Sequence, residues 1–334
     1  MGTKYNQSTK RSRDQKESSD RPLSTPNGIS NPAGALRARL ASGPPLLLDG
    51  ALGTELERLG MACHLPLWSS LALLDAPERV SKIHRAYALA GCEILTANTF
   101  RTQRRTLSRA TIASRCVELT ELAVRLARNA SSQSKHTVFV AGSAPPLEDC
   151  YQPERVAEAE GLQREHTEHA ENLAGAGVDL ILVETHNTIR EAEAASKAAK
   201  ETGLPFFVSF VCGSEARLLS GEELERAIDA VMQYGPLCVA VNCLPPSLIS
   251  PCLPVLKTAT SDSSSKTAFG IYPNLGSPNE DGYNEACSPE KFAQHALGAV
   301  EFGARLIGGC CGTTPDHMRA AASALNRLER VSRS

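Results

Sequence analysis

Three cysteines in the second half of the chain have the chemistry of metal ligands. Cys243 follows the apolar run 238–241, and the pair Cys310-Cys311 stands 67 positions further along. Thiolates bind Zn²⁺ at about 2.3 Å, and a catalytic zinc site typically has three protein ligands and one open position. Three thiols brought together would therefore suit an ion with one exchangeable ligand.

The glycines around the cysteine pair decide whether both thiols can face one ion. Successive side chains of a regular strand point to opposite faces, so the backbone must bend between Cys310 and Cys311. Gly308, Gly309 and Gly312 permit conformations that other residues avoid, and so allow this bend. The residues alone leave open that the two cysteines are small core residues or form a vicinal disulfide.

Glu184 is a second candidate, because it ends the apolar run 178–183. A buried carboxylate without a partner is costly, so a cation is expected beside it. A substrate ammonium would serve that purpose. The alternative is a structural ion pair with Arg190 or Lys197.

The elements that must position these residues alternate between short apolar runs and longer amphipathic segments. The apolar runs are continuous blocks, which is typical of parallel strands covered by helices. Strands are predicted at Leu46–Asp49, Glu93–Ala97, Val138–Ala141, Val178–Val183, Phe206–Val211, Cys238–Val241, Ala268–Ile271 and Arg305–Ile307. Helices are predicted at Pro77–Ala90, Leu107–Asn129, Pro153–Ala174, Thr188–Thr202, Gly221–Tyr234, Ser247–Thr258, Pro289–Phe302 and Pro315–Leu328.

Eight strand-then-helix units over roughly 290 residues predict an α/β fold, the (β/α)8 TIM barrel. A doubly wound open sheet is the alternative. Active sites of such barrels lie at the carboxyl ends of the strands, and polar and thiol residues follow the predicted strands at that end. The ends of the sixth and eighth strands are near neighbours in a closed barrel, so Cys243, Cys310 and Cys311 are expected to converge.

Composition excludes other classes of protein. The net charge is −2, from 35 Lys and Arg against 37 Asp and Glu, and only 4% of residues are aromatic. A nucleic-acid binder would carry a basic surface and stacking side chains. A membrane protein would carry about 18 or more consecutive apolar residues, and no run approaches that length. These observations favour an enzyme acting on small molecules, and the sequence carries no signal for an oligomeric state.

The chain is expected to hold a single domain over residues 41–332, preceded by a disordered polar tail over residues 1–40. The first 31 residues are rich in Ser, Lys, Arg and Asp and lack the apolar core of a signal peptide. Eleven scattered cysteines favour a reducing compartment over a disulfide framework. A cytoplasmic location is therefore expected.

A further histidine pattern resembles a metal motif only superficially. His166 and His169 are three residues apart, whereas the helical zinc motif places its histidines four apart. Acidic residues surround them in a predicted helix. A solvated helix face is the expected interpretation.

Three motifs together resemble one family. The segment Ala304–His317 (ARLIGGCCGTTPDH), the tripeptide Val241-Asn242-Cys243 and the segment Leu47–Leu56 (LLDGALGTEL) closely resemble the zinc-dependent homocysteine S-methyltransferases. The resemblance runs from about Leu46 to Leu328, and leaves the tail and an insertion at 261–265 outside. It implies that Cys243, Cys310 and Cys311 bind Zn²⁺, and that Glu184 holds the amino group of homocysteine.

The family divides by methyl donor. The segments Pro66–Ser69 and Ala72–Leu74, with Pro77-Glu78, look like the branch that uses S-methylmethionine or S-adenosylmethionine. The implied reaction moves a methyl group from this sulfonium donor to the homocysteine thiolate and yields methionine. Alternatives are methylation of selenocysteine, and a non-catalytic barrel with a structural or redox zinc-cysteine site.

Further residues at strand ends are candidate substrate contacts. Backbone N–H groups at Gly50 and Ala51 are expected to receive the substrate carboxylate, because a helix begins close behind them. Asp49 is expected to contact the amino group or to support the residues that do. Asn98 either orients the substrate or satisfies backbone groups at its strand end. Asn274 either takes the fourth zinc position without substrate or caps the turn at 272–273.

Overall fold

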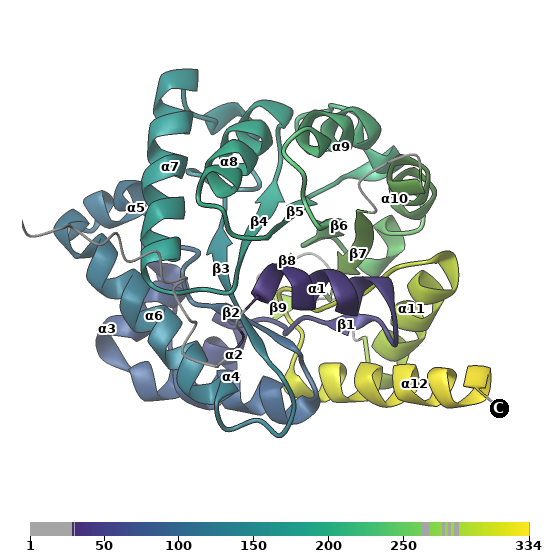
Figure 1. Ribbon diagram of the computed structural model, residues 1–334. Coiled ribbons are helices and arrows are strands. Elements are labelled where there is room, and N and C mark those ends of the chain that lie inside the picture. The colour runs from purple at the N-terminus through teal and green to yellow at the C-terminus, as the bar shows by residue number, and fades with distance from the viewer. Residues whose placement is uncertain are drawn as a thin grey trace, which may run out of the picture.

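The computed structural model describes residues 29, 31–261, 267–275, 278–279, 282–283 and 287–333. One eight-stranded parallel sheet runs through this part of the chain in the order β1-β10-β7-β6-β5-β4-β3-β2 (Figure 1). A parallel bridge between Leu48 and Ile94 joins the first strand to the second, so the sheet closes on itself. Helices surround it, and the predicted (β/α)8 TIM barrel is confirmed.

The barrel strands are β1 (Leu46–Leu47), β2 (Ile94–Ala97), β3 (Phe139–Ala144), β4 (Leu180–His186), β5 (Phe206–Phe210), β6 (Cys238–Asn242), β7 (Ala268–Tyr272) and β10 (Leu306–Ile307). A short antiparallel pair, β8 (Pro278–Asn279) and β9 (Gly282–Tyr283), follows β7 in the sequence. The helices are α1 (Pro32–Ala41), α2 (Gly53–Arg58), α3 (Leu71–Asp75), α4 (Pro77–Ala90), α5 (Arg104–Arg109), α6 (Cys116–Ser131), α7 (Ala159–Gly175), α8 (Ile189–Glu201), α9 (Leu224–Met232), α10 (Cys252–Ser261), α11 (Pro289–Phe302) and α12 (Pro315–Arg333).

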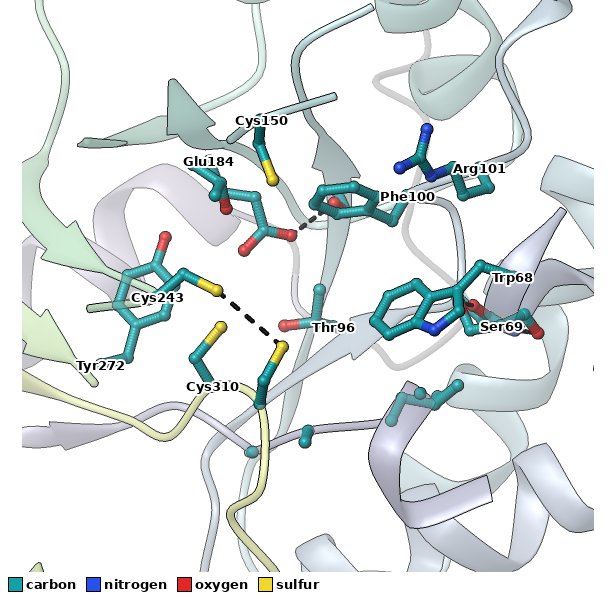
Figure 2. Close-up of a pocket in the computed structure, with 18 of the residues that line it drawn as sticks. Trp68, Ser69, Thr96, Phe100, Arg101, Cys150, Glu184, Cys243, Tyr272 and Cys310 are labelled. Atoms are coloured by element: carbon teal, nitrogen blue, oxygen red, sulfur yellow. Dashed lines mark hydrogen bonds between the residues drawn. The ribbon is translucent and has the colours of Figure 1, made fainter. Parts of the chain in front are cut away.

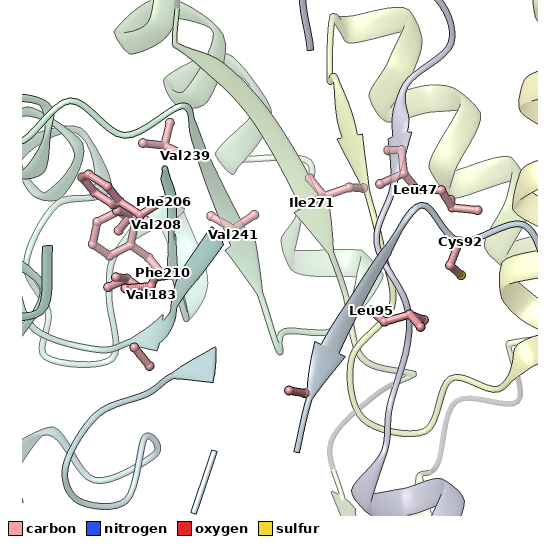
Figure 3. Packing of buried hydrophobic residues seen from close by; sticks show 14 of the residues in the cluster. Leu47, Cys92, Leu95, Val183, Phe206, Val208, Phe210, Val239, Val241 and Ile271 are labelled. Atoms are coloured by element: carbon pink, nitrogen blue, oxygen red, sulfur yellow. The ribbon is translucent and has the colours of Figure 1, made fainter. Parts of the chain in front are cut away.

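The strands are apolar on both faces because each face packs against a different layer. Leu180 and Leu182 of β4 point into the barrel, whereas Ile181 and Val183 belong to the cluster between sheet and helices. This follows from the two-residue period of a strand. Figure 3 shows part of the outer cluster, to which β5 contributes Phe206 and other side chains.

Three predicted helices are interrupted in the structure. The segment 153–174 divides into a 3-10 helix at Pro153–Arg155 and α7, and the segment 247–258 divides into a 3-10 helix at Pro246–Leu248 and α10. The segment 107–129 is divided between α5 and α6, with a short 3-10 helix at Ala113–Arg115 between them. Thr111 has a φ of 60°, in the left-handed region, and a right-handed helix cannot continue through that conformation. The apolar periodicity continues across the break, and so predicted a single helix.

The predicted tail also extends too far. Residues 32–40 lie in α1, and the remainder of the predicted tail, apart from residues 29 and 31, is outside the described residues, as is most of the 261–265 insertion. Asn31 caps this helix by accepting a hydrogen bond from the Gly34 N–H at 2.9 Å. Leu36 and Leu40, four residues apart on one helix face, join the cluster inside the barrel. In Figure 1 α1 lies across one end of the barrel.

The histidines of α7 are buried, which contradicts the expected solvated face. His166 and His169 are 2% and 3% exposed. His166 lies 3.2 Å from Glu191, and His169 lies 3.0 Å from the carbonyl of Ser143. The helix turns its acidic residues outward instead, where Glu165 and Glu168 pair with arginines of α5. Among the described residues, neither histidine belongs to a cluster of metal-binding side chains.

Helix α1 is expected to contribute to stability through its buried leucines. Leu36→Ala should lower the free energy of unfolding by about 2–5 kcal/mol, because it removes buried methyl groups and leaves a cavity. Leu89→Ala is the matched control, since Leu89 is 70% exposed. Denaturant unfolding of both variants measures the difference. Equal stability of the two variants would show that the burial of Leu36 does not stabilise the fold.

No helix in the described part of the chain combines the length and apolar character needed to cross a bilayer.

Candidate metal centre and substrate pocket

A cavity of about 360 Å³ opens at the carboxyl ends of the barrel strands. Its lining comes from the ends of seven strands and the loops behind them, and includes Asp49, Gly50, Ala51, Asn98, Glu184, Cys243, Cys310 and Cys311. Eight of the nine sequence-predicted site residues therefore line one cavity. Asn274 is not among its lining residues.

The three cysteine thiols meet on one side of this cavity (Figure 2). Their sulfur atoms all lie within 4.8 Å of one another, and those of Cys243 and Cys311 are 3.8 Å apart. Two ligands at about 2.3 Å from a tetrahedral zinc ion are themselves about 3.8 Å apart. The donor set and its spacing therefore fit a zinc ion.

The backbone around the thiols has the bend that their convergence requires. Cys243 has a φ of 57° and Gly312 a φ of 82°, both in the left-handed region. A Cβ added to Gly309 would lie 2.4 Å from Oγ1 of Thr313, so only glycine fits beneath the pair. These conformations turn both Cys310 and Cys311 toward Cys243.

Without a cation, the three thiols oppose one another's ionisation. Hydrogen bonds to Cys243 and Cys311, followed by burial, raise the pKa of the Cys310 thiol well above its usual range. A divalent cation offsets this effect, because a coordinating thiol is deprotonated outright.

Glu184 lies above the cysteines with its carboxylate in the cavity (Figure 2). Burial raises its pKa to about 7, a hydrogen bond from the Ser143 hydroxyl opposes this shift, and the negative charge of Cys311 adds to it. Neither of the cations proposed as structural partners, Arg190 and Lys197, forms an ion pair with it. The carboxylate is therefore placed to gain from a cation brought by a ligand.

Asp49 is held by the neighbouring strand. Its carboxylate accepts hydrogen bonds from the backbone N–H and the hydroxyl of Thr96, each at 2.8 Å. Burial raises the pKa of Asp49 to about 8, although these hydrogen bonds act in the opposite direction. The N–H of Ala51 donates to Oγ1 of Thr313 at 3.2 Å, so this N–H already has a partner.

Asn98 makes a reciprocal pair with Ser69. Its side-chain oxygen accepts from the Ser69 hydroxyl, and its amide donates to the Ser69 carbonyl, both at 2.9 Å. This pairing joins the end of β2 to the 3-10 helix Trp68–Ser70 that precedes α3. It favours the second of the two expected roles, that of satisfying local polar groups.

The comparisons with known proteins agree on one family. Residues 46–325 match the family model described as homocysteine S-methyltransferase. Homocysteine S-methyltransferase 4 of Zea mays is 30% identical, with 89% of this chain and 94% of that protein covered.

The chain belongs to the homocysteine S-methyltransferase family.

Relatives of known structure in this family share the barrel. The oxidized and metallated forms of the homocysteine methyltransferase MmuM from Escherichia coli are 28% and 29% identical, with TM-scores of 0.76 and 0.74. Each covers 88% of this chain and 99% of its own. A methionine synthase of Mycobacterium leprae is 28% identical over 84% of this chain, which spans 24% of that longer protein.

In this homocysteine S-methyltransferase, the cavity also contains side chains to which no role in the site was assigned from the sequence. The hydroxyl of Tyr151 lies 2.9 Å from the Cys243 sulfur. Trp68 and Phe100 meet edge to face, with ring centroids 6.3 Å apart, and Arg101 stands beside Phe100. Trp68 lies in the short 3-10 helix Trp68–Ser70 and the others lie in loops, where no periodic pattern marks the direction of a side chain.

Asn274 lies close behind the cysteines of this family member. It is 2% exposed, and its backbone N–H donates to the carbonyl of Leu244 at 3.1 Å. The neighbouring Pro273 carbonyl accepts from the N–H of Cys310 at 2.8 Å. The turn that carries Asn274 is thus tied to both cysteine segments. A role in the fourth zinc position stays a prediction.

Proposed function

We propose that this enzyme transfers a methyl group from a sulfonium donor, S-methylmethionine or S-adenosylmethionine, to the thiolate of homocysteine, and forms methionine. We further propose that it does so with Zn²⁺ held by Cys243, Cys310 and Cys311. The observation that carries the proposal is the convergence of three thiols within 4.8 Å in a cavity that also exposes Glu184.

The cysteine cluster suits an exchangeable metal site. Among the described residues, no fourth His, Cys, Asp or Glu joins the three cysteines, and a structural zinc site is usually closed by a fourth protein ligand. Bound zinc would keep the thiol of homocysteine ionised at neutral pH. This arrangement supports catalysis over a structural zinc site.

Glu184 positions homocysteine in this proposal. Its carboxylate pairs with the substrate ammonium, which favours its ionised form despite the pKa of about 7. Asp49 supports the same end of the cavity from beneath, through its hydrogen bonds with Thr96.

The aromatic side chains suit the donor. Trp68, Phe100 and Tyr151 line the cavity, and the face of an aromatic ring attracts a cation such as a sulfonium. These rings also exclude water from the space between donor and acceptor.

The reaction needs no positioned general base. A lone pair of the homocysteine sulfur forms the new S–CH3 bond, while the bond from that methyl group to the donor sulfur breaks. The donor leaves as a neutral thioether, so charge disappears from both partners. A cavity with little water favours such a transition state over the separated ions.

Methionine formation tests the proposal directly. Zinc-loaded protein is incubated with homocysteine and, in separate reactions, S-methylmethionine, S-adenosylmethionine or glycine betaine. We expect methionine from a sulfonium donor and little from betaine, while selenocysteine in place of homocysteine measures the alternative acceptor. A zinc-loaded protein that forms no methionine with any donor would contradict the proposed function.

A further inference from the structure

Arg101 lines the cavity as a cation that has no anionic partner among the residues the structure describes. It follows Phe100 in the loop behind β2. Its Nε is buried and has no hydrogen-bond partner within the described residues, and burial lowers the pKa of its guanidinium. A guanidinium partly removed from water without a partner is costly, so a ligand that brings an anion would be stabilised here.

The other arginines of this segment differ from Arg101, because each of them has a carboxylate partner. Three arginines of α5 have carboxylate partners: Arg104 pairs with Glu168, Arg105 with Glu165 and Glu148, and Arg109 with Glu148. Arg101 precedes this helix by three residues and lines the cavity instead. Of these four arginines, the one without a carboxylate partner is therefore the one that lines the cavity.

Two carboxylates interact electrostatically with Arg101, those of Glu148 and Asp149, and both already have other partners. Glu148 pairs with Arg105 and Arg109 at 2.9 and 2.6 Å. Asp149 accepts hydrogen bonds from the N–H of Tyr151 at 2.9 Å and from Gln152 at 2.7 Å. Within the described part of the chain, these carboxylates leave Arg101 unpaired, and a ligand could supply the anion.

The direction of Arg101 is set by an aromatic neighbour. The guanidinium carbon lies 5.5 Å from the centre of the Phe100 ring. In Figure 2 Arg101 stands on the far side of Phe100 from the cysteines and Glu184. A planar guanidinium held in this way matches a carboxylate with two parallel hydrogen bonds.

We propose that Arg101 binds the carboxylate of the methyl donor, and so selects sulfonium donors that carry one. The inference rests on the proposed function. The acceptor does not suit Arg101, because the carboxylate and ammonium of homocysteine share one carbon and its ammonium belongs at Glu184. The charge of the donor gives a second reason, since an unpaired guanidinium would repel a sulfonium, and a donor carboxylate removes that repulsion.

Two donors that differ only in this group provide the test. S-methylmethionine carries the carboxylate, and its carboxamide does not. Each is titrated calorimetrically into zinc-loaded wild type, Arg101→Gln and the control Arg85→Gln, in which an exposed arginine on α4 is changed far from the cavity. Methionine formation is then measured with each donor and homocysteine.

We expect Arg101→Gln to raise the Kd and KM for S-methylmethionine by about 10- to 100-fold, the usual effect of losing a hydrogen bond to a charged group. The carboxamide should bind Arg101→Gln no more weakly than wild type, because the variant lacks the charge that repels its sulfonium, and the KM for homocysteine should not change. Arg85→Gln should match wild type throughout. Arg101→Lys keeps the charge but loses the planar fork, and should be intermediate.

Several results would overturn the inference. Equal losses with both donors would indicate a structural role, and a raised KM for homocysteine alone would assign Arg101 to the acceptor. Unchanged binding of S-methylmethionine by Arg101→Gln would also overturn it, while normal methionine formation would leave the proposed function intact. Conversely, Arg101-dependent binding without any methionine in wild type would defeat the proposed function and retain the carboxylate site.

Discussion

Cys243→Ala is expected to lose its zinc and, with it, methionine formation. Loss of an outer-shell partner typically costs 10–100-fold in metal affinity or activity, so loss of a direct thiolate ligand should cost more than about 100-fold. Cys310→Ala and Cys311→Ala should behave alike, because the three sulfur atoms lie within 4.8 Å of one another. Metal content per chain and the rate of methionine formation measure both effects.

Cys63→Ala is the matched control for this series. Cys63 is a partly exposed cysteine outside the cluster, so its variant should keep both metal and activity. Thermal unfolding of each variant separates metal loss from misfolding. Full zinc stoichiometry in all three cluster variants would rule out the assignment of the ligands.

Glu184→Gln is expected to weaken homocysteine binding while the zinc content stays unchanged. Truncation of one partner of a buried charge pair costs about 2 kcal/mol or more, which corresponds to an increase in KM of about 30-fold or more. The glutamine keeps an oxygen that can accept from the Ser143 hydroxyl, so the local structure should persist. Steady-state kinetics at varied homocysteine concentration give the KM.

Glu168→Gln provides the comparison for Glu184→Gln. Glu168 pairs with Arg104 at the surface, where both side chains are partly exposed, and such pairs contribute little. This variant should therefore show wild-type kinetics. If Glu184→Gln also kept the wild-type KM and kcat, the carboxylate would have no role in binding the substrate.

Local signals account for the elements that were predicted within a residue or two. Helices α4 and α11 begin at Pro77 and Pro289 and end before Gly91 and Gly303, and the predicted bounds agree with both. Proline has the φ of a first helical turn, and each glycine takes a positive φ that ends the helix. These signals lie within a few residues of the boundary, so the sequence alone suffices.

Local signals fail where packing decides. The segment 32–40 contains only two leucines, and only the apolar interior at the end of the barrel makes Leu36 and Leu40 a buried pair. The break at Thr111 likewise leaves no mark in the apolar period. At α1, contacts with distant segments decide the outcome.

The sequence by itself determined the barrel, the end of it that bears the site and the three thiols, because strand order and strand ends follow from the apolar blocks. Only the tertiary structure decided which loop side chains enter the cavity. Tyr151 reaches Cys243 across 92 positions, and Arg101 is left unpaired because its neighbours take the available carboxylates. Such contacts depend on loop conformation and on competition among many partners, and neither is encoded in a periodic pattern.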